Sequence, residues 1–535
     1  MNAQASRWLA VLAALSIAAG SACTPRGDRP SEDRDSPTAN AAADRPAPAA
    51  ASATPASEPT AGGGDRNSQR EETWMACYIN GSKIGYTHLV MEPAVEDGRA
   101  CLRFSYDDEL KIRRFDTETV IRTRLTSLET ADGQLLSFRS EMQSGPGTMA
   151  TEGRRQGDQL QLRTSNQGKV DEHALPWEPH YGGFFADQLS LRRQPMRPGE
   201  SRRLRALLPV LNLVGEVRLE ATAWEATDLP SGSRQLLRIN VTTVAGAAQL
   251  RSVLWTDRDG RPHKLKDLQL GMEALVTTRE EAQEAGSGGY DLGFDTIVRV
   301  DRPLPDAHRT RRVVYRAALK DGEVKSLFAE CLAQTVRTLD DDAVEIAVQA
   351  VRPDQPPSVA GRKIEPPTDA DRTASTMLQS DDPVVLQLAQ AVAVDESDAW
   401  TIARVLESEV KKKIRLKNYS TAMATAAEVA RSLEGDCTEH AMLLAAMCRA
   451  RGIPARVAIG LVYYPSAGGF AYHMWTEAWI ADRWIPLDAT LGLGGIGGAH
   501  LKLAHSSMQG TAAYAELLPV IQALGRLQLE ILSVE

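Results

Sequence analysis

The chain has 535 residues, of which 43% are hydrophobic and 24% are charged. This length and composition are ordinary for globular proteins and allow several hydrophobic cores. The formal net charge of −9 argues against a nucleic-acid-binding protein, because such a protein would show an excess of basic residues.

Residues 1–22 have the form of a secretory signal peptide. Arg7 precedes an apolar run from Trp8 to Ala19, and small residues follow directly before Cys23. A cysteine in that place resembles the lipidated first residue of bacterial lipoproteins, although Gly20 stands where a leucine is usual. Plain cleavage and release is the alternative. We expect an exported protein of the bacterial cell envelope, anchored to the membrane by a lipid on Cys23.

Residues 23–70 are rich in Pro, Ala, Ser, Asp, Arg and Gly and poor in large apolar residues. Such a segment cannot bury enough surface to offset the entropy of ordering, so we predict a disordered linker. Residues 71–310 show strand-like alternation and a strong hairpin signal at Asn80-Gly81, which predicts an antiparallel β-sheet region. Similar turns near Glu129 and Thr256 suggest that it could contain two related units.

The six cysteines are too few and too scattered for a disulfide framework. A simple meander would place Cys77 and Cys101 two strands apart, roughly 9–10 Å, which is too far for a disulfide. We expect most of the cysteines to be buried thiols.

Residues 311–372 read as a short β segment with a Pro-rich link, and helical patterning takes over in residues 373–535. The segments "DDPVVLQLAQAVA" and "DAWTIARVLESEVKKKI" carry apolar residues at spacings of three and four. A third helix in "TAMATAAEVARSLE" is expected to stop at Gly435. The glycines of "GLGGIGGAH" suggest a mobile loop further on.

The next helix is predicted to start at Cys437, with Asp436 near its cap. The N–H groups of a first helical turn and the helix dipole stabilise a thiolate, so this position suits a nucleophilic cysteine. Cys448 falls on the apolar stripe of the same helix and is interpreted as core. Alone, Cys437 would also be interpreted as a buried structural thiol.

Two strands follow in "AYHMWTEAWIADRWIPLDAT", with His473 on the first and Asp488 at the end of the second. A two-residue turn at Asp482-Arg483 would place Asp488 opposite Glu477 and leave His473 roughly 13 Å away. A longer loop, a bulge or strong twist would therefore be needed to bring His473 and Asp488 together.

A cysteine, a histidine and an aspartate in this order suit papain-like chemistry, in which the imidazole takes the thiol proton and the carboxylate orients the imidazole. The segments "GDCTEHAMLLAAMCRARGIPARVAIGLV", "HMWTEAWI" and "RWIPLDAT" resemble the transglutaminase-like superfamily, over about 65 residues. The resemblance implies a catalytic triad of Cys437, His473 and Asp488 and a papain-like α+β domain without a metal. The predicted fold is thus multidomain, with an antiparallel β-rich N-terminal region and a C-terminal transglutaminase-like domain.

Other roles remain open for residues near these motifs. A zinc site is the main alternative, but its candidate ligands fit no common structural-zinc spacing, so we predict neither metal nor cofactor; they are Cys437, His440, His473, His500 and His505. For the oxyanion, the Cys437 N–H is one natural donor and Tyr419 is a second candidate. Glu439 and Trp475 are interpreted as walls of the site or as packing.

The family resemblance implies an acyl-thioester at Cys437. We predict acyl transfer or hydrolysis on amides of proteins or peptides, cell-wall peptides included. Hydrolysis is favoured because it needs no second substrate site. The alternative is a non-catalytic envelope lipoprotein that binds a partner through its N-terminal β region, which is larger than the catalytic core.

Overall fold

The computed structural model of the chain describes residues 70–535, with gaps at 115–116, 145–146, 167, 209–210, 247, 287–289, 321–323, 353–364, 393–397, 416–423, 510–514, 517 and 524. The predicted signal peptide, the lipidation of Cys23 and the linker up to residue 69 lie outside the described residues. Within the described ranges, no helix combines the length and the apolar character that a membrane crossing requires.

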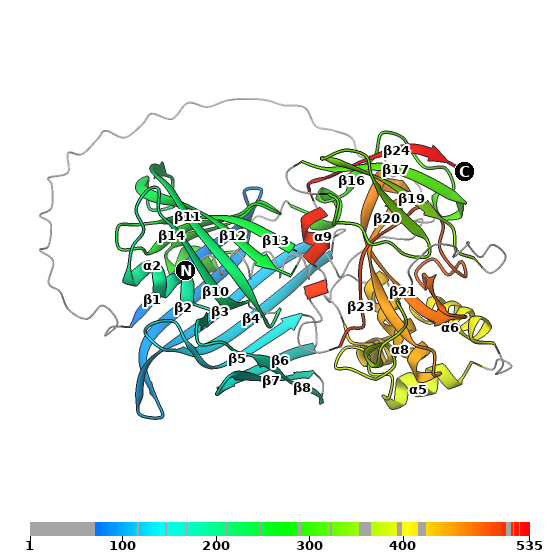
Figure 1. The fold of residues 1–535 in the computed structure, drawn as a ribbon, viewed down its shortest axis with the longest axis horizontal. Coiled ribbons are helices and arrows are strands. Elements are labelled where there is room, and N and C mark those ends of the chain that lie inside the picture. The colour runs from blue at the N-terminus through cyan, green and yellow to red at the C-terminus, as the bar shows by residue number, and fades with distance from the viewer. Residues whose placement is uncertain are drawn as a thin grey trace, which may run out of the picture.

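A fifteen-stranded sheet forms the N-terminal region of the described chain (Figure 1), in the order β8-β7-β6-β5-β4-β3-β2-β1-β15-β14-β13-β12-β11-β10-β9. Neighbouring strands are antiparallel except for the short parallel pair of β9 and β10. The two segments with similar turns, near Glu129 and Thr256, belong to a single sheet, because β1 of the first segment pairs with β15 of the second. The strands are β1 Glu71–Ile79, β2 Ser82–Glu96, β3 Arg99–Arg114, β4 Thr117–Glu129, β5 Leu135–Ser144, β6 Gly147–Gln156, β7 Gln159–Asn166, β8 Lys169–Pro176, β9 Tyr181–Gly182, β10 Ser201–Leu208, β11 Leu213–Thr227, β12 Arg234–Ala245, β13 Ala248–Thr256, β14 Pro262–Asp267 and β15 Met272–Thr277.

The predicted hairpin at Asn80-Gly81 is confirmed. Both residues have positive φ, 47° and 80°, and they connect β1 to β2 as a tight two-residue turn. Positive φ at both central positions is the geometry that matches the twist of the flanking strands and that Asn-Gly tolerates best. This local signal could therefore be interpreted correctly without knowledge of the rest of the sheet.

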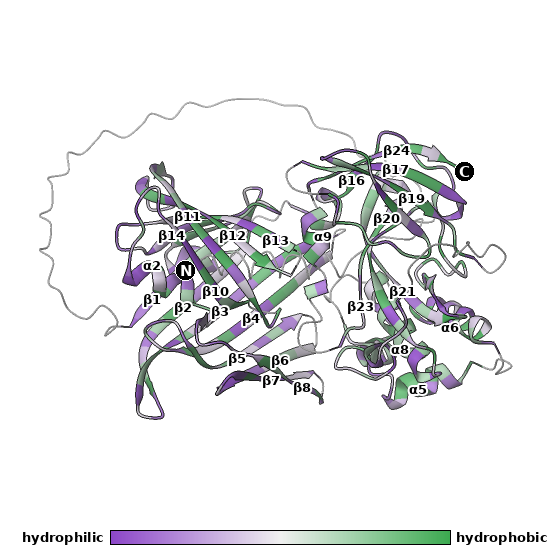
Figure 2. Cartoon of the chain, viewed as in Figure 1, coloured by the Kyte–Doolittle hydropathy of each residue, from purple (hydrophilic) through white to green (hydrophobic). Residues whose placement is uncertain are grey.

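Hydrophobic and hydrophilic residues alternate along the strands (Figure 2), and in β3 and β4 the residues of one face are buried. On that face the ring of Phe104 stacks on Phe185, with centroids 4.2 Å apart. Phe185 directly precedes the short helix α2 (Ala186–Arg193), which closes part of this core. The two cysteines of the region are buried free thiols, as predicted. Two further short helices follow the last strand, α3 (Arg279–Gln283) and α4 (Leu292–Asp295).

The C-terminal domain contains a second sheet in the order β16-β21-β20-β23, with β22 paired to β21. Helix α8 packs on β20 and β21, and α5, α6 and α7 pack on α8 (Figure 1). This arrangement of helices on an antiparallel sheet confirms the predicted α+β class. The elements are β16 Val298–Arg299, α5 Pro383–Gln390, α6 Ala399–Lys413, α7 Ala426–Ser432, α8 Cys437–Ala450, β20 Ala455–Tyr464, β21 Gly469–Ile480, β22 Arg483–Leu487, β23 His500–Ser506 and α9 Leu518–Ala523.

A third sheet has the order β18-β19-β17-β24 and joins the middle of the chain to its last described strand. β17 (Arg312–Leu319), β18 (Gln334–Thr338) and β19 (Ala343–Gln349) come from the segment that we predicted as a short β unit. β24 (Leu527–Val534) pairs antiparallel with β17. The segment therefore packs as part of the C-terminal half of the molecule.

Helix α7 ends differently from the prediction. Its last residue is Ser432, and Leu433 adopts the left-handed conformation, with φ 52°, that was expected of Gly435. Gly435 is required for another reason, because a Cβ there would lie 2.3 Å from the Cγ of Glu439. The expected stop at Gly435 is therefore wrong by two residues, and the glycine instead allows the close approach between this loop and α8.

The edge of the large sheet contacts the segment that leads into α5. The Nζ of Lys169 in β8 lies 2.5 Å from a carboxylate oxygen of Asp381. The hydroxyl of Thr376 donates to Asp171, also in β8, over 2.8 Å. These contacts join the N-terminal sheet to the helical part of the C-terminal domain.

Candidate active site

Cys437 is the first residue of α8 and is fully buried. The Asp436 side chain accepts a hydrogen bond from the Thr438 N–H over 2.9 Å, and Glu439 accepts one from the Asp436 N–H over 3.0 Å. This reciprocal capping box holds the start of the helix in place. The sulfur therefore lies at the positive end of the helix dipole, where a thiolate is stabilised. The role of Glu439 is this cap.

Several ionisable groups surround the start of α8. Burial, and then repulsion from Glu439 and Cys437, raise the pKa of Asp436 well above its usual value, while Arg114 acts in the opposite direction. Burial, followed by the charges of Cys437 and Asp436, also raises the pKa of Tyr472 well above its usual value. Tyr472 therefore stays a neutral phenol, and its hydroxyl is buried without a hydrogen-bond partner in the described structure.

Strand β21 carries His473 next to Tyr472, and the hydroxyl of Thr476 in the same strand donates to the Ala441 carbonyl of α8 over 2.9 Å. This bond fixes the helix against the strand. Helix α8, which begins at Cys437, packs along β21, the strand that carries His473. The fold thus brings the predicted nucleophile and base into the same region.

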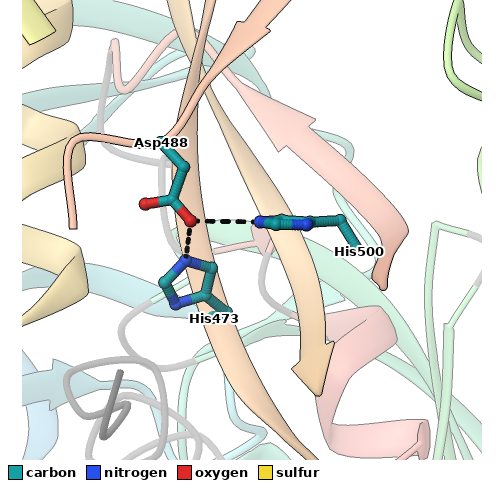
Figure 3. Close-up of side chains that lie close together, drawn as sticks. All are labelled: His473, Asp488 and His500. Carbon is teal, nitrogen blue, oxygen red and sulfur yellow. Dashed lines mark hydrogen bonds and ion pairs between the residues drawn. The ribbon is translucent and has the colours of Figure 1, made fainter. Parts of the chain in front are cut away.

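The nitrogen Nε2 of His473 lies 2.8 Å from Oδ2 of Asp488 (Figure 3). The expected two-residue turn at Asp482-Arg483 is wrong, since the turn residues are Ala481 and Asp482, with φ of 48° and 57°. β21 and β22 therefore pair with Leu487 opposite Thr476. Asp488 follows directly after β22, where it leaves the ladder and reaches His473.

The hydrogen bonds of Asp488 determine the tautomer of His473. Burial alone would raise the pKa of Asp488, but the charge of His473 and hydrogen bonds from His473 and His500 hold it well below its usual value. The N–H of Thr490 also donates to its other oxygen, Oδ1, over 2.9 Å. An ionised carboxylate can only accept, so Nε2 of His473 carries the hydrogen. In the neutral ring the lone pair then lies on Nδ1, which is the basic nitrogen.

His500 shares this carboxylate, because its Nε2 lies 3.0 Å from the same Oδ2 of Asp488 (Figure 3). Burial lowers the pKa of His500, so it favours the neutral ring. The glycine-rich segment before it is not the loose loop that we expected. It is buried, and Gly495 approaches the Val351 carbonyl so closely that a Cβ would lie 2.0 Å from the oxygen.

Comparison with known proteins identifies the domain. Residues 386–489, from α5 to the residue after Asp488, match the Transglutaminase-like superfamily. The chain carries a transglutaminase-like domain. The match contains Cys437, His473 and Asp488. At the level of the superfamily, it supports the papain-like architecture of a thiol enzyme.

Two solved structures resemble the chain at low sequence identity. A candidate cysteine protease from Cytophaga hutchinsonii is 14% identical, covering 42% of this chain and 89% of its own, with a TM-score of 0.27. A candidate protease from Parabacteroides distasonis is 12% identical, covering 68% and 67%, with a TM-score of 0.18. No curated protein matches the chain. These two similarities carry no argument about the activity of the transglutaminase-like domain.

The five candidate zinc ligands of the sequence analysis lie in different environments. His440 forms a hydrogen bond to the Asp436 carbonyl through Nδ1 over 2.6 Å. His505 lies with the charges of Lys502 and Arg456, and burial is the main cause that lowers its pKa to about 3. Of the five candidates, His473 and His500 share one hydrogen-bond partner, Asp488.

His473, Asp488 and His500 nevertheless offer three possible metal ligands within 4.8 Å of one another. Their N–O separations of 2.8 and 3.0 Å are hydrogen-bond lengths. Ligand atoms around a tetrahedral zinc ion lie roughly 3.3 Å apart. A metal would therefore have to replace both hydrogen bonds of the transglutaminase-like site, and the expected absence of a metal stays a prediction.

A cavity of about 700 Å³ lies beside this site, within the size range of ligand pockets. His440, one turn along α8 from Cys437, and Thr490, two residues after Asp488, belong to its wall. His308 also lines the cavity, and burial, followed by the charge of His500, lowers its pKa to about 4. The cavity therefore borders the neighbours of the candidate triad.

Trp475 packs among the histidines of the site. Its ring lies 6.2 Å from that of His473 and 5.4 Å from that of His500, measured between centroids. It thus packs against both histidines that bind Asp488. Tyr419, the proposed oxyanion donor, lies outside the described residues.

Sequence reasoning missed three residues near the site, Arg114, His308 and Tyr472, and it missed the bond from His500 to Asp488. Tyr472 could have been found, because it directly precedes the motif segment that begins at His473. No local signal marks Arg114 or His308, since they lie far away in the chain and are brought here by tertiary packing alone.

Proposed function

We propose that the protein is a thiol-dependent enzyme that hydrolyses or transfers the acyl groups of protein or peptide amides through an acyl-thioester at Cys437. The observation that carries the proposal is the His473–Asp488 hydrogen bond of 2.8 Å, formed beside the capped start of α8. This pairing supplies an oriented base, and the helix start supplies a position that favours a thiolate. Cell-wall peptides remain a candidate substrate.

The reaction begins with transfer of the Cys437 thiol proton to Nδ1 of His473. The sulfur attacks the amide carbonyl, and the C–S bond forms as the carbonyl oxygen becomes an oxyanion. The C–N bond then breaks, and the imidazolium returns its proton to the leaving amine. Asp488 keeps its negative charge throughout and stabilises the imidazolium. Water or a second amine then attacks the thioester and gives a proton to His473. The C–S bond breaks, the Cys437 sulfur takes that proton back, and the product is that of hydrolysis or transamidation.

The oxyanion needs donors that are in place before the charge develops. The N–H of Cys437 at the start of α8 is one such donor. The hydroxyl of Tyr472 is the other candidate, since it is neutral and buried and lies next to His473 on β21, the strand against which α8 packs.

The alkylation rate of Cys437 against pH tests the proposal. With iodoacetamide, the wild type should keep reacting well below the ordinary thiol pKa of ~8.5, because His473 takes the proton. His473→Ala should lose this acid-side reactivity, whereas His180→Ala, at an exposed histidine, should react like the wild type. Tryptic digestion leaves Cys437 and Cys448 in one peptide, so fragment spectra must separate them. Cys448, whose pKa is raised by burial to about 12, serves as the internal control.

A slow rate that follows ordinary thiol titration and does not depend on His473 would show that Cys437 is structural. Circular dichroism of each variant checks that its fold is retained.

We also propose that the enzyme works in the bacterial envelope, held there by a lipid on Cys23. The basis is the signal-peptide pattern and the small residues before this cysteine. Cells fed labelled palmitate should label the wild type and leave Cys23→Ala unlabelled. Equal labelling of the two proteins would exclude Cys23 as the lipid site.

A further inference from the structure

The cavity beside the triad has an apolar wall and a cationic rim. Its apolar residues are Leu304, Ala307, Ile414, Pro465, Leu491 and Leu493. Three cations, Arg309, Lys411 and Arg415, line it together with a single acid, Asp306. All four charged residues are exposed.

Among the described residues, no ion pair involves Arg309, Lys411 or Arg415. Lys411 donates to the Leu491 carbonyl, and Nε of Arg415 donates to the Lys412 carbonyl over 3.2 Å. Both acceptors are neutral, so the positive charges persist at the cavity.

The position of the cavity connects this charge to the chemistry. Arg309 follows His308, whose ring lies 6.2 Å from that of His500, measured between centroids. Lys411 lies in the last turn of α6, and Arg415 follows two residues after its end. The Lys411 side chain lies against Gly492, where a Cβ would be 2.3 Å from the Lys411 Cδ. Gly492 donates its N–H to the Asp488 carbonyl over 2.7 Å. Gly492 thus connects Lys411 of the cationic rim to Asp488 of the triad.

We propose that this cavity binds the acyl-donor peptide through a carboxylate, so that the site prefers acidic peptides over uncharged ones of the same shape. The apolar wall would contact the rest of the peptide, and Arg309 and Arg415 would attract the carboxylate, as a cluster of like charges at a cleft does. An arginine can also hold a carboxylate through two hydrogen bonds. This inference rests on the proposed function and adds a substrate class to it.

The test compares iodoacetate with iodoacetamide at Cys437 in the full chain. The two reagents share their shape and leaving group and differ by one negative charge. The rate ratio of iodoacetate to iodoacetamide should be about five- to tenfold higher at Cys437 than at a reference cysteine peptide. Arg309→Gln and Arg415→Gln should each lower this ratio about two- to fivefold, and 0.5 M salt should lower it as well. Lys412→Gln, at the next residue on α6 and outside the cavity, should leave the ratio unchanged.

A ratio equal to that of the reference peptide, and unaffected by the arginine variants, would overturn the inference while fast alkylation still supported the proposed function. If neither reagent reaches the buried thiol, calorimetry with Cys437→Ala decides. The peptide Ac-Ala-Glu-Ala-amide should then bind at least fivefold more tightly than Ac-Ala-Gln-Ala-amide, and Arg309→Gln should remove the difference. Equal affinities would overturn the inference.

Discussion

Replacement of Asp488 by asparagine is expected to slow acylation of Cys437 by about 10³–10⁴-fold while the fold is retained. Oδ2 of Asp488 accepts from the Nε2 atoms of both His473 and His500, and Oδ1 accepts from the Thr490 N–H. An asparagine has one accepting oxygen and one NH₂ group. In either orientation of the amide, its NH₂ group faces a donor.

The orientation of the amide decides how activity is lost. If the NH₂ group occupies the Oδ2 position, His473 must move its hydrogen to Nδ1, and the nitrogen that should take the thiol proton is no longer basic. If it occupies the Oδ1 position, His473 keeps its tautomer but loses the negative charge that stabilises its protonated ring. Both outcomes impair proton transfer, which is why this single change is expected to have the largest effect on rate.

The acylation rate is measurable with p-nitrophenyl acetate, whose burst of p-nitrophenol reports thioester formation. Asp482→Asn is the matched control, because Asp482 lies in the turn before β22 and asparagine tolerates its φ of 57°. His500→Gln should cost about tenfold, the value of one hydrogen bond. A burst in Asp488→Asn as fast as in the wild type would contradict the assigned role of the carboxylate.

Replacement of Lys502 by methionine is expected to reduce the free energy of unfolding by about 3–5 kcal/mol. Lys502 Nζ lies 2.6 and 2.7 Å from the two oxygens of Glu477, and Arg456 donates to the same carboxylate over 2.7 Å. All three residues are buried. Burial alone would raise the pKa of Glu477, but Lys502 and Arg456 outweigh it and lower the pKa to about 2. Loss of Lys502 leaves this buried carboxylate with one cation.

The linkage to pH follows from the sign of the shift. Because the pKa of Glu477 is lower in the folded state, its ion pairs stabilise the protein above the ordinary pKa of 4.5, and this stabilisation is lost as pH falls towards 2. In Lys502→Met the loss should begin at higher pH, because the pKa of Glu477 should rise.

Urea denaturation at pH 7 gives the free energies of unfolding. Combining Lys502→Met with Glu477→Gln should recover part of the loss, because the uncompensated charge is removed as well. A single-variant cost below about 1 kcal/mol would show that water already screens this network.

The sequence alone determined the features that depend on local chemistry. The Asn80-Gly81 turn, the cap at Asp436 and the start of a helix at Cys437 follow from the preferences of a few adjacent residues. The three motif segments, read together, were sufficient to predict the transglutaminase-like domain. Each of these signals lies within a short stretch of chain, and its energy does not depend on distant partners.

Tertiary structure decided the rest. The hydrogen bond between His473 and Asp488 depends on a turn that lies one residue earlier than predicted, and Ala481 gives no local sign that it adopts positive φ. The bond from His500 to Asp488 and the placement of Arg309 at the cavity join segments that only packing brings together. Such contacts form because the buried sheet and helices fix the backbone, and their energy belongs to the assembled core. For that reason a reading of neighbouring residues could identify the reactive groups but not the shared carboxylate or the cationic cavity beside it.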